Sequence, residues 1–144
     1  MNSESTVYDL GCGRGRAAFL FHFLTGAKVV AIDLVGPFIV TARRLAKWMG
    51  CDQHVLFCYE NFLNSDIEKA DIVYACALCL SQETREALAS RLQGCRDGTY
   101  LVSVGWNPNK PWLHSLESFS TSFSWGEAPV YLKQIRFNEA PLDE

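Results

Sequence analysis

The sequence lacks three features: an excess of positive charge, an apolar stretch long enough to span a membrane, and a secretory signal. With 13 Lys and Arg residues against 16 Asp and Glu residues, its net charge is −3, so it lacks the positive excess that binding to nucleic-acid phosphates requires. Its longest apolar stretch in the first expected helix, residues 17–24, is far too short to cross a bilayer. No basic segment leads into an apolar one near the N-terminus, as it would in a secretory signal. These features indicate neither nucleic acid nor a membrane as a partner, and they favour a cytoplasmic protein.

Cysteine is present, but its setting argues against a disulfide framework. The residues lie mostly in apolar segments, where a reduced thiol packs like a small apolar group. Cys76 and Cys79 have the spacing of half a zinc site, and no second pair completes one, so we expect no metal. Structural packing is the favoured role, with redox chemistry or the lining of a ligand pocket as alternatives. The six residues are Cys12, Cys51, Cys58, Cys76, Cys79 and Cys95.

The composition and the hydrophobic pattern predict a fold with alternating strands and helices. The chain has 144 residues, of which 49% are apolar and 20% charged, which is typical of one globular domain and excludes a disordered chain. Nearly continuous apolar runs predict buried strands, and helical spacing predicts helices between them. Strands are expected at residues 6–10, 28–34, 54–59, 70–78 and 99–106, and helices at 14–25, 36–49 and 82–93.

Such alternation predicts an α/β domain over residues 1–144. Its three layers would be a doubly wound, mostly parallel sheet with helices on both faces. Past the fifth strand, residues 117–124 and 130–137 predict an antiparallel hairpin at one edge, with a turn at 125–129. Ligands of doubly wound sheets bind at the carboxyl ends of the strands, so the residues that follow each strand are the candidates for a site.

A glycine-rich turn follows the first expected strand. Gly11, Gly13 and Gly15 would let the backbone turn sharply and approach a ligand closely. In a dinucleotide-binding turn the third glycine comes one residue later, and Arg16 occupies that position here. Asp9 precedes the first glycine, where a carboxylate would suit the ammonium group of a ligand better than a pyrophosphate. Arg14 and Arg16 either attract a carboxylate of the ligand or face solvent.

Two further signals follow the second and third strands. Asp33 comes about twenty residues after the first glycine, where a carboxylate can accept both hydroxyls of a ribose. Glu60, Asn61 and Phe62 combine polar groups for an adenine amino group with an apolar cover for its ring. A ligand with an amine and a ribose but no phosphate is described better by S-adenosylmethionine than by NAD.

The pattern as a whole resembles the class I (Rossmann-fold) S-adenosylmethionine-dependent methyltransferases. The stretch from Asp9 to Gly15 is similar to the first motif of that family, residues 70–74 to its fourth strand and residues 96–102 to the turn before its fifth. The resemblance implies S-adenosylmethionine as cofactor and S-adenosylhomocysteine as product. It implies cofactor contacts from Asp9, Gly11, Cys12, Gly13, Gly15, Asp33, Leu34, Glu60, Asn61, Phe62 and Ala75.

Within that class, residues 60–63 and 70–80 distantly resemble the non-SET histone-lysine methyltransferase core. That family has paired asparagines after its fourth strand, where this sequence has Cys76 and Ala77. Methyl transfer from an activated sulfonium needs mainly proximity and alignment, so no catalytic acid or base is predicted. The acceptor, a protein side chain or a small molecule, is not identified. The alternatives are a non-catalytic cofactor-binding or scaffold domain and an NAD-dependent oxidoreductase.

The rim of the expected site carries the last features. Only five residues precede the first strand, whereas the resembling enzymes carry upstream helices that cover the cofactor. We therefore expect an open site without those lid helices, covered by a second copy or a partner subunit. Trp106, Trp112 and Trp125 follow the fifth strand, where packing or a subunit contact is favoured and an acceptor pocket is the alternative. Tyr74, inside a strand, is expected in the core.

Overall fold

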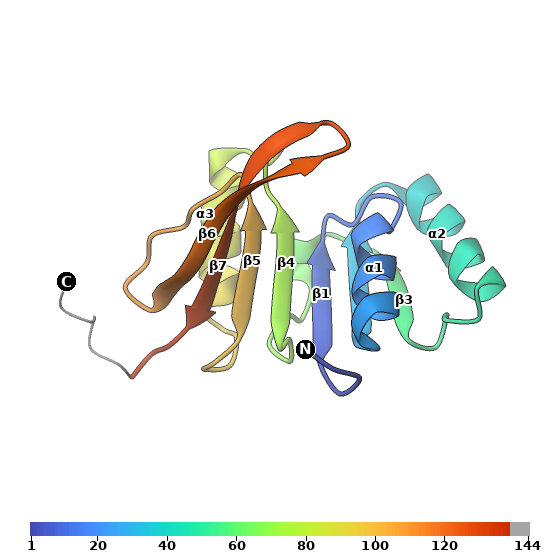
Figure 1. Ribbon diagram of the computed structural model, residues 1–144, viewed down its shortest axis with the longest axis horizontal. Helices are drawn as coiled ribbons and strands as arrows, with labels where there is room; N and C mark the ends of the chain where they lie inside the picture. Colours follow the sequence, from blue (N-terminus) through green and yellow to red (C-terminus); the bar gives the residue numbers. More distant parts are fainter. Residues whose placement is uncertain (139–144) are drawn as a thin grey trace.

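A seven-stranded sheet forms the centre of the computed structural model, which describes residues 1–138 (Figure 1). The strand order is β3-β2-β1-β4-β5-β7-β6. The first five strands in the sequence pair in parallel, and the last two are antiparallel. The strands are β1 (Thr6–Leu10), β2 (Lys28–Asp33), β3 (Val55–Tyr59), β4 (Ile72–Cys76), β5 (Tyr100–Val104), β6 (Leu113–Phe123) and β7 (Gly126–Ile135).

The direction of strand addition reverses between β1 and β4. From β1 the chain adds β2 and then β3 on one side, and it then crosses to place β4 and β5 on the other side. This reversal is the switch point at which open α/β sheets bind their ligands. The sheet therefore confirms the predicted doubly wound order, and it directs attention to the carboxyl ends of β1, β2 and β4.

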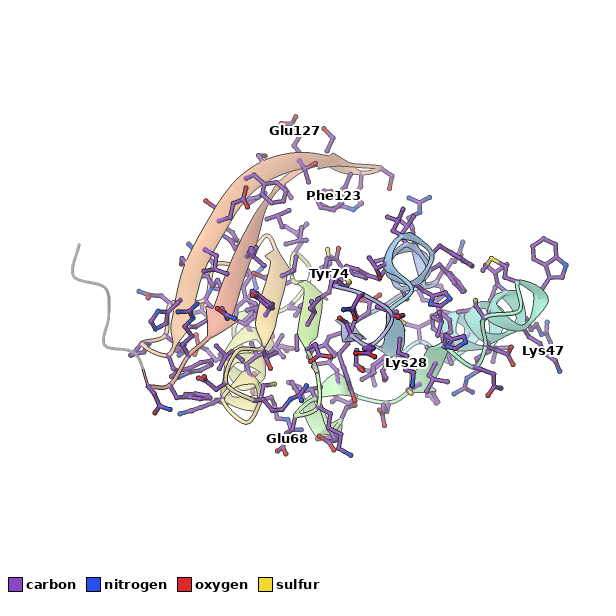
Figure 2. All side chains as sticks on the ribbon, turned by 60° about the horizontal axis from the view of Figure 1, so that its bottom comes forward. Lys28, Lys47, Glu68, Tyr74, Phe123 and Glu127 are labelled. Atoms are coloured by element: carbon purple, nitrogen blue, oxygen red, sulfur yellow. The ribbon has the colours of Figure 1, made fainter. Side chains whose placement is uncertain are left out.

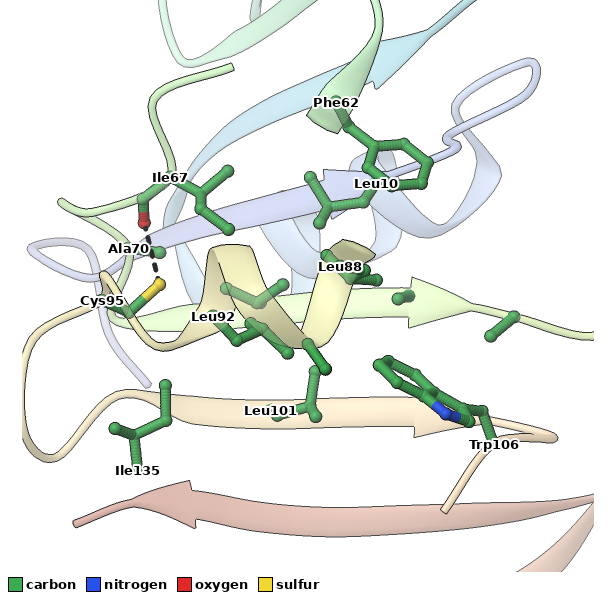
Figure 3. Close-up of a cluster of buried hydrophobic side chains, with 14 of the residues drawn as sticks. Leu10, Phe62, Ile67, Ala70, Leu88, Leu92, Cys95, Leu101, Trp106 and Ile135 are labelled. Carbon is green, nitrogen blue, oxygen red and sulfur yellow. Dashed lines mark hydrogen bonds between the residues drawn. The ribbon is translucent and has the colours of Figure 1, made fainter. Parts of the chain in front are cut away.

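Helices cover both faces of the sheet, as the sequence predicts. On one face, α1 (Arg16–Thr25) and α2 (Gly36–Trp48) bury Ala18 and Ile39 in a cluster with side chains of β1, β2 and β3. On the other face, α3 (Gln82–Leu92) buries Leu88 and Leu92. Figure 3 shows this second cluster, in which Leu10, Phe62, Leu101 and Trp106 surround α3. A short 3-10 helix, η1 (Phe62–Asn64), follows β3.

The helices end where local chemistry predicts. Gly26 has a φ of 76° and donates its backbone N–H to the His22 carbonyl, which closes α1. The Ser81 hydroxyl accepts the Thr84 backbone N–H at 3.1 Å and caps the start of α3. None of the helices in residues 1–138 has both the length and the apolar character that crossing a membrane requires.

Several element boundaries differ from the sequence prediction by one to four residues. The first helix begins at Arg16, since Gly15 has a φ of 88°, which an α-helix cannot contain. The fourth strand ends at Cys76. The next carbonyl, that of Ala77, accepts a hydrogen bond from the Arg85 guanidinium at 2.7 Å instead of one from a neighbouring strand. The predicted hairpin turn at 125–129 is wrong. Ser124 and Trp125 alone form the turn, while residues 126–129 continue the strand pairing.

Candidate functional site

The turn from β1 to α1 is held by its own backbone and by β2. Gly11, Gly13 and Gly15 all have positive φ, at 79°, 55° and 88°. The Gly11 N–H donates to the Ile32 carbonyl at 2.8 Å, and the Gly13 N–H donates to Asp33 Oδ2 at 2.7 Å. A Cβ added at Gly11 or Gly13 would meet no atom within 4 Å, so both glycines face open space. A ligand can approach the backbone closely there.

Gly15 has a different role from the other two glycines. A Cβ at this position would lie 2.6 Å from the Phe57 ring, which is closer than side chains pack. The glycine thus lets the turn pack directly on β3 and on the first turn of α1. Cys12 lies between the glycines, and its side chain is buried in the cluster beneath α1 and α2.

Asp33 connects the turn to the end of β2. Its Oδ2 accepts the Gly13 N–H, and its Oδ1 accepts the Val35 N–H at 2.8 Å. A carboxylate offers about four lone-pair directions, so two remain for hydroxyl donors. Asp33 is partly exposed, and Leu34, which follows it, is 61% exposed. This end of β2 can therefore receive a sugar, with an apolar side chain beside it.

Asp9 is buried beside the same turn. Its side chain is 1% exposed, and its Oδ2 has no hydrogen-bond partner. Burial, the largest cause, and the charge of Asp33 together raise the pKa of this carboxyl from 3.8 to about 7, although the Ala18 N–H lowers it in part. A buried polar atom without a partner is costly unless a ligand satisfies it. Asp9 is thus suited to a cationic group that donates hydrogen bonds.

A hollow of about 340 Å³ opens above Asp9, between α1 and the hairpin formed by β6 and β7. Figure 2 shows Phe123 and Tyr74 in this space, below the arch of the hairpin. Most of its lining is apolar or aromatic. Its lining residues are Asp9, Gly11, Cys12, Arg16, Ala17, Leu20, Tyr74, Cys76, Phe123, Ser124 and Trp125.

The remaining predicted contacts lie near the end of β3 and on β4. The Glu60 N–H donates to the Asp33 carbonyl, which places this segment beside the end of β2. Asn61 caps η1 by accepting the Leu63 N–H at 3.0 Å. Phe62 is 8% exposed and Ala75 is fully buried, and both belong to the cluster around α3. The structure thus brings the backbone of Glu60 to Asp33, with Asn61 next in the chain, whereas the Phe62 ring packs inward.

The hollow also contains residues that sequence reasoning did not assign to the site. Tyr74, expected in the core, is the register partner of Asp9 on the neighbouring strand and lines the hollow. Cys76 lies two residues further along β4 on the same face. Because side chains alternate along a strand, the pairing of β1 with β4 would have revealed both residues. No local feature of the sequence predicts that pairing.

The three tryptophans past β5 do not act together. Trp106 is 8% exposed in the cluster around α3, and Trp112 packs against that cluster. Trp125 lies at the tip of the hairpin, is 54% exposed and lines the hollow. Packing is therefore the role of the first two, whereas the third is available to a ligand.

Burial favours the neutral form of the thiols near the site. All six cysteines are free, and burial raises the pKa of Cys12, Cys58 and Cys76 above the ordinary value for a thiol. A neutral thiol is a poor nucleophile and a poor metal ligand. Within residues 1–138, no three His, Cys, Asp or Glu side chains lie together as a metal ion would require.

A comparison with protein families shows the family to which the chain belongs. The sequence model of the methyltransferase domain matches residues 7–98, more than half of the chain, a span that contains Asp9, the glycine-rich turn and Asp33. The chain belongs to the methyltransferase domain family. The predicted family resemblance is confirmed at this level, and nothing in the comparisons tests the likeness to histone-lysine methyltransferases.

A curated relative of this methyltransferase domain is also a methyltransferase. Geranyl diphosphate 2-C-methyltransferase of Streptomyces lasalocidi is 28% identical over 107 residues, which are 72% of this chain and 36% of that protein. The chain thus spans about a third of the length of that curated relative.

Solved structures extend the comparison to nearly the whole chain. An RNA methyltransferase from Salinibacter ruber, in complex with S-adenosyl-L-homocysteine, has a TM-score of 0.73 and 26% identity, covering 99% of this chain and 87% of its own. A geranyl diphosphate C-methyltransferase from Streptomyces coelicolor A3(2) has a TM-score of 0.75 and 14% identity, covering 94% and 75%. These likenesses confirm that the methyltransferase domain has the predicted α/β fold.

Proposed function

We propose that residues 1–144 form one S-adenosylmethionine-binding domain that transfers a methyl group to an acceptor. The observation that carries the proposal is the pair of acids at the switch point of the sheet. Asp33, beside the glycine-rich turn, suits ribose hydroxyls, and the unpartnered Asp9 suits an ammonium group. Relatives of the domain that are solved with S-adenosylhomocysteine support this cofactor.

In this proposal the cofactor would lie across the carboxyl ends of β1, β2 and β3. The open space over Gly11 and Gly13 would receive the centre of the molecule. Asp33 and Leu34 would hold the ribose and cover the adenine, and Glu60 and Asn61 would meet the adenine edge. At the other end, Asp9 would accept the ammonium group, and the exposed Arg16 would attract the carboxylate.

The reaction requires alignment more than acid–base chemistry. When bound, S-adenosylmethionine supplies a methyl group on an activated sulfonium, and the sulfur keeps the bonding electron pair as the methyl leaves. The chain would hold that group rigidly in the glycine-rich turn, so that an acceptor can be placed in line with it. Burial raises the pKa of Tyr74 to about 12, so its hydroxyl stays protonated at neutral pH and is not available as a base. An acceptor that must lose a proton would therefore need to release it to another base.

Calorimetric titration with S-adenosylmethionine, S-adenosylhomocysteine and NAD tests the proposal. We expect saturable binding of the first two and none of NAD. Asp33→Ala removes the ribose acceptor and one support of the turn, so affinity should fall by roughly tenfold to a hundredfold. Asp33→Asn keeps one acceptor oxygen and should lose less.

A matched control separates the site from general electrostatics. Asp52→Ala removes a partly buried carboxylate in the turn before β3, and it should bind S-adenosylhomocysteine like the wild type. Circular dichroism establishes that each variant is folded. Binding of NAD in place of the adenosyl compounds would overturn the proposal. Binding without methylation of any acceptor class would instead establish the non-catalytic alternative.

The acceptor, partners and location complete the proposal. The acceptor would be a small molecule or a protein side chain that reaches the transferred methyl. Leu20, Phe23 and Leu24 of α1 are each more than half exposed, which supports a second copy or a partner subunit on this face. Six free thiols favour a reducing compartment such as the cytoplasm. Light scattering of the purified chain would measure its oligomeric state.

A further inference from the structure

The hairpin of β6 and β7 extends beyond the rest of the sheet and reaches the cofactor site. The last residue of β5 in the sheet, Val104, pairs with Val130 of β7. Residues 126–129 of β7 and 120–123 of β6 continue to pair with each other past that point. Figure 1 shows this projecting end bending over the carboxyl ends of the strands. The hairpin tip, defined as Phe123, Ser124 and Trp125, lines the same hollow as Asp9 and Gly11.

The position of the tip is fixed by packing. Phe123 contacts a cluster that includes Val104, Val130 and Tyr74. At the base of the projecting end, the Gly105 N–H donates to the Pro129 carbonyl at 2.8 Å. Phe123 and Trp125 stack with their ring centres 4.8 Å apart and their planes 4° from parallel. The tip is therefore a preorganised aromatic surface, and it retains one largely exposed ring, that of Trp125.

The chemistry of the hollow matches one kind of group. Asp9 offers a buried oxygen without a partner, and Arg16 lies at the rim with no ion pair to any described carboxylate. An acid and a base that line the same small hollow suit a zwitterion. Aromatic faces attract positive charge and exclude water from the ion pairs beneath them. An α-amino acid group satisfies all three features.

We propose that the hairpin tip closes over the amino acid end of the cofactor, with Trp125 and Phe123 as cofactor-binding residues. This inference rests on the proposed function and adds the element that covers the site within this chain. The tip would act on the ammonium, the carboxylate and the neighbouring sulfonium. It would leave the adenosine end, at Asp33 and Asn61, untouched.

The test compares two ligands that differ only at that end. S-adenosylhomocysteine carries the amino acid group, whereas 5′-methylthioadenosine has the same adenosine and thioether without it. Trp125→Ala should weaken S-adenosylhomocysteine by roughly tenfold in calorimetry and leave 5′-methylthioadenosine unchanged. Trp125 is a surface residue, so this substitution should preserve the fold.

Trp48 provides the matched control. It is 83% exposed at the end of α2, away from the hollow, so Trp48→Ala should bind both ligands like the wild type. In a Trp48→Phe background, S-adenosylhomocysteine should also shift tryptophan fluorescence to shorter wavelength, and 5′-methylthioadenosine should not.

The outcomes separate this inference from the proposed function. Unchanged affinity of Trp125→Ala for S-adenosylhomocysteine would overturn the inference while cofactor binding stands. An equal loss for both ligands would also overturn it, because the tip would then act through the fold. If the wild type bound neither ligand, the proposed function would fail and the inference with it.

Discussion

At the residue scale, two aspartates of similar sequence setting have opposite environments. Asp33 is partly exposed and accepts two backbone N–H groups. Asp9 is buried, and burial is the largest cause of its raised pKa. Asp33 can therefore hold the turn and a ligand at the same time. The charged form of Asp9 is unfavourable until a cationic group pairs with it.

The pH dependence of cofactor affinity tests the role of Asp9. Only the charged carboxylate pairs with an ammonium group, and the pKa of Asp9 is about 7 in the free protein. The affinity for S-adenosylhomocysteine should therefore rise roughly tenfold per pH unit below about pH 7 and level off above it. Asp9→Asn should bind more weakly above that pH and remove this slope. Calorimetry between about pH 5.5 and about pH 7.5 measures it.

Stability provides a control with the opposite sign. The folded-state pKa of Asp9 lies above its unfolded value of 3.8, so this residue destabilises the ligand-free fold as pH rises from about 4 to about 7. Asp9→Asn should consequently raise the melting temperature at neutral pH and leave it unchanged in acid. Glu117→Gln, which removes an exposed carboxylate of β6, should change neither the melting temperature nor the pH dependence of affinity for S-adenosylhomocysteine. A slope that persists in Asp9→Asn would assign the titration to another group.

At the element scale, the glycines of the glycine-rich turn have two kinds of role: Gly15 allows close packing, and Gly11 and Gly13 leave space for a ligand. Its spacing and its place after a strand were predictable, because glycine is required wherever the backbone has positive φ. The start of α1 was predicted two residues too early, since propensity does not reveal which glycine ends the turn. The different roles of Gly13 and Gly15 depend on Phe57, which lies far along the chain.

Two matched substitutions test these roles. Gly15→Ala places a Cβ against the Phe57 ring and imposes a φ that alanine disfavours, so it should lower the free energy of unfolding by about 2–4 kcal/mol. Gly13→Ala meets no protein atom and should cost only about 1 kcal/mol. Its Cβ would nevertheless enter the space for the ligand. Urea unfolding and calorimetry should show a stability defect for the first and a binding defect for the second.

For the hairpin, the sequence pattern predicted the two strands but not the position of the turn between them. Two strands at the C-terminal edge were predicted and confirmed, but the turn was placed over residues 125–129 because Gly126 and Pro129 are typical of turns. Pro129 is in fact paired with Ser120 within the ladder. The longer pairing is what carries the tip over the hollow, so an error of a few residues concealed how far the hairpin extends.

At the scale of the whole molecule, one sheet separates two cores. The core around α3 contains Leu88, which is fully buried, and it continues to Leu10 of β1, the strand that leads into the cofactor turn. The core under α1 and α2 lies on the opposite face. Both cores include side chains of β1 and β2, so we expect them to unfold together.

A cavity in the core around α3 tests this coupling. Leu88→Ala should lower the free energy of unfolding by about 2–5 kcal/mol. The change should appear equally in far-ultraviolet circular dichroism and in tryptophan fluorescence, as expected for one cooperative transition. Affinity for S-adenosylhomocysteine should stay unchanged while the protein is folded, because Leu88 lies on the face away from the hollow. Two separate transitions would contradict the coupling.

The sequence by itself determined the class of fold and the candidate site residues at the ends of β1 and β2. The glycine-rich turn, Asp9 and Asp33 are recognisable because each stands at a fixed distance from a strand end, and strand ends follow from local hydrophobic runs. Fold class follows from the same alternation of strands and helices.

Only the tertiary structure decided what lies above Asp9. Tyr74 comes beside it through the register of β1 with β4, and Trp125 lines the same hollow because it lies on a hairpin that begins beyond β5. Both placements bring together segments that are distant in the chain, and they depend on strand order and register rather than on local propensity. The unpartnered oxygen of Asp9 is likewise a property of packing, because only the assembled sheet removes water from it.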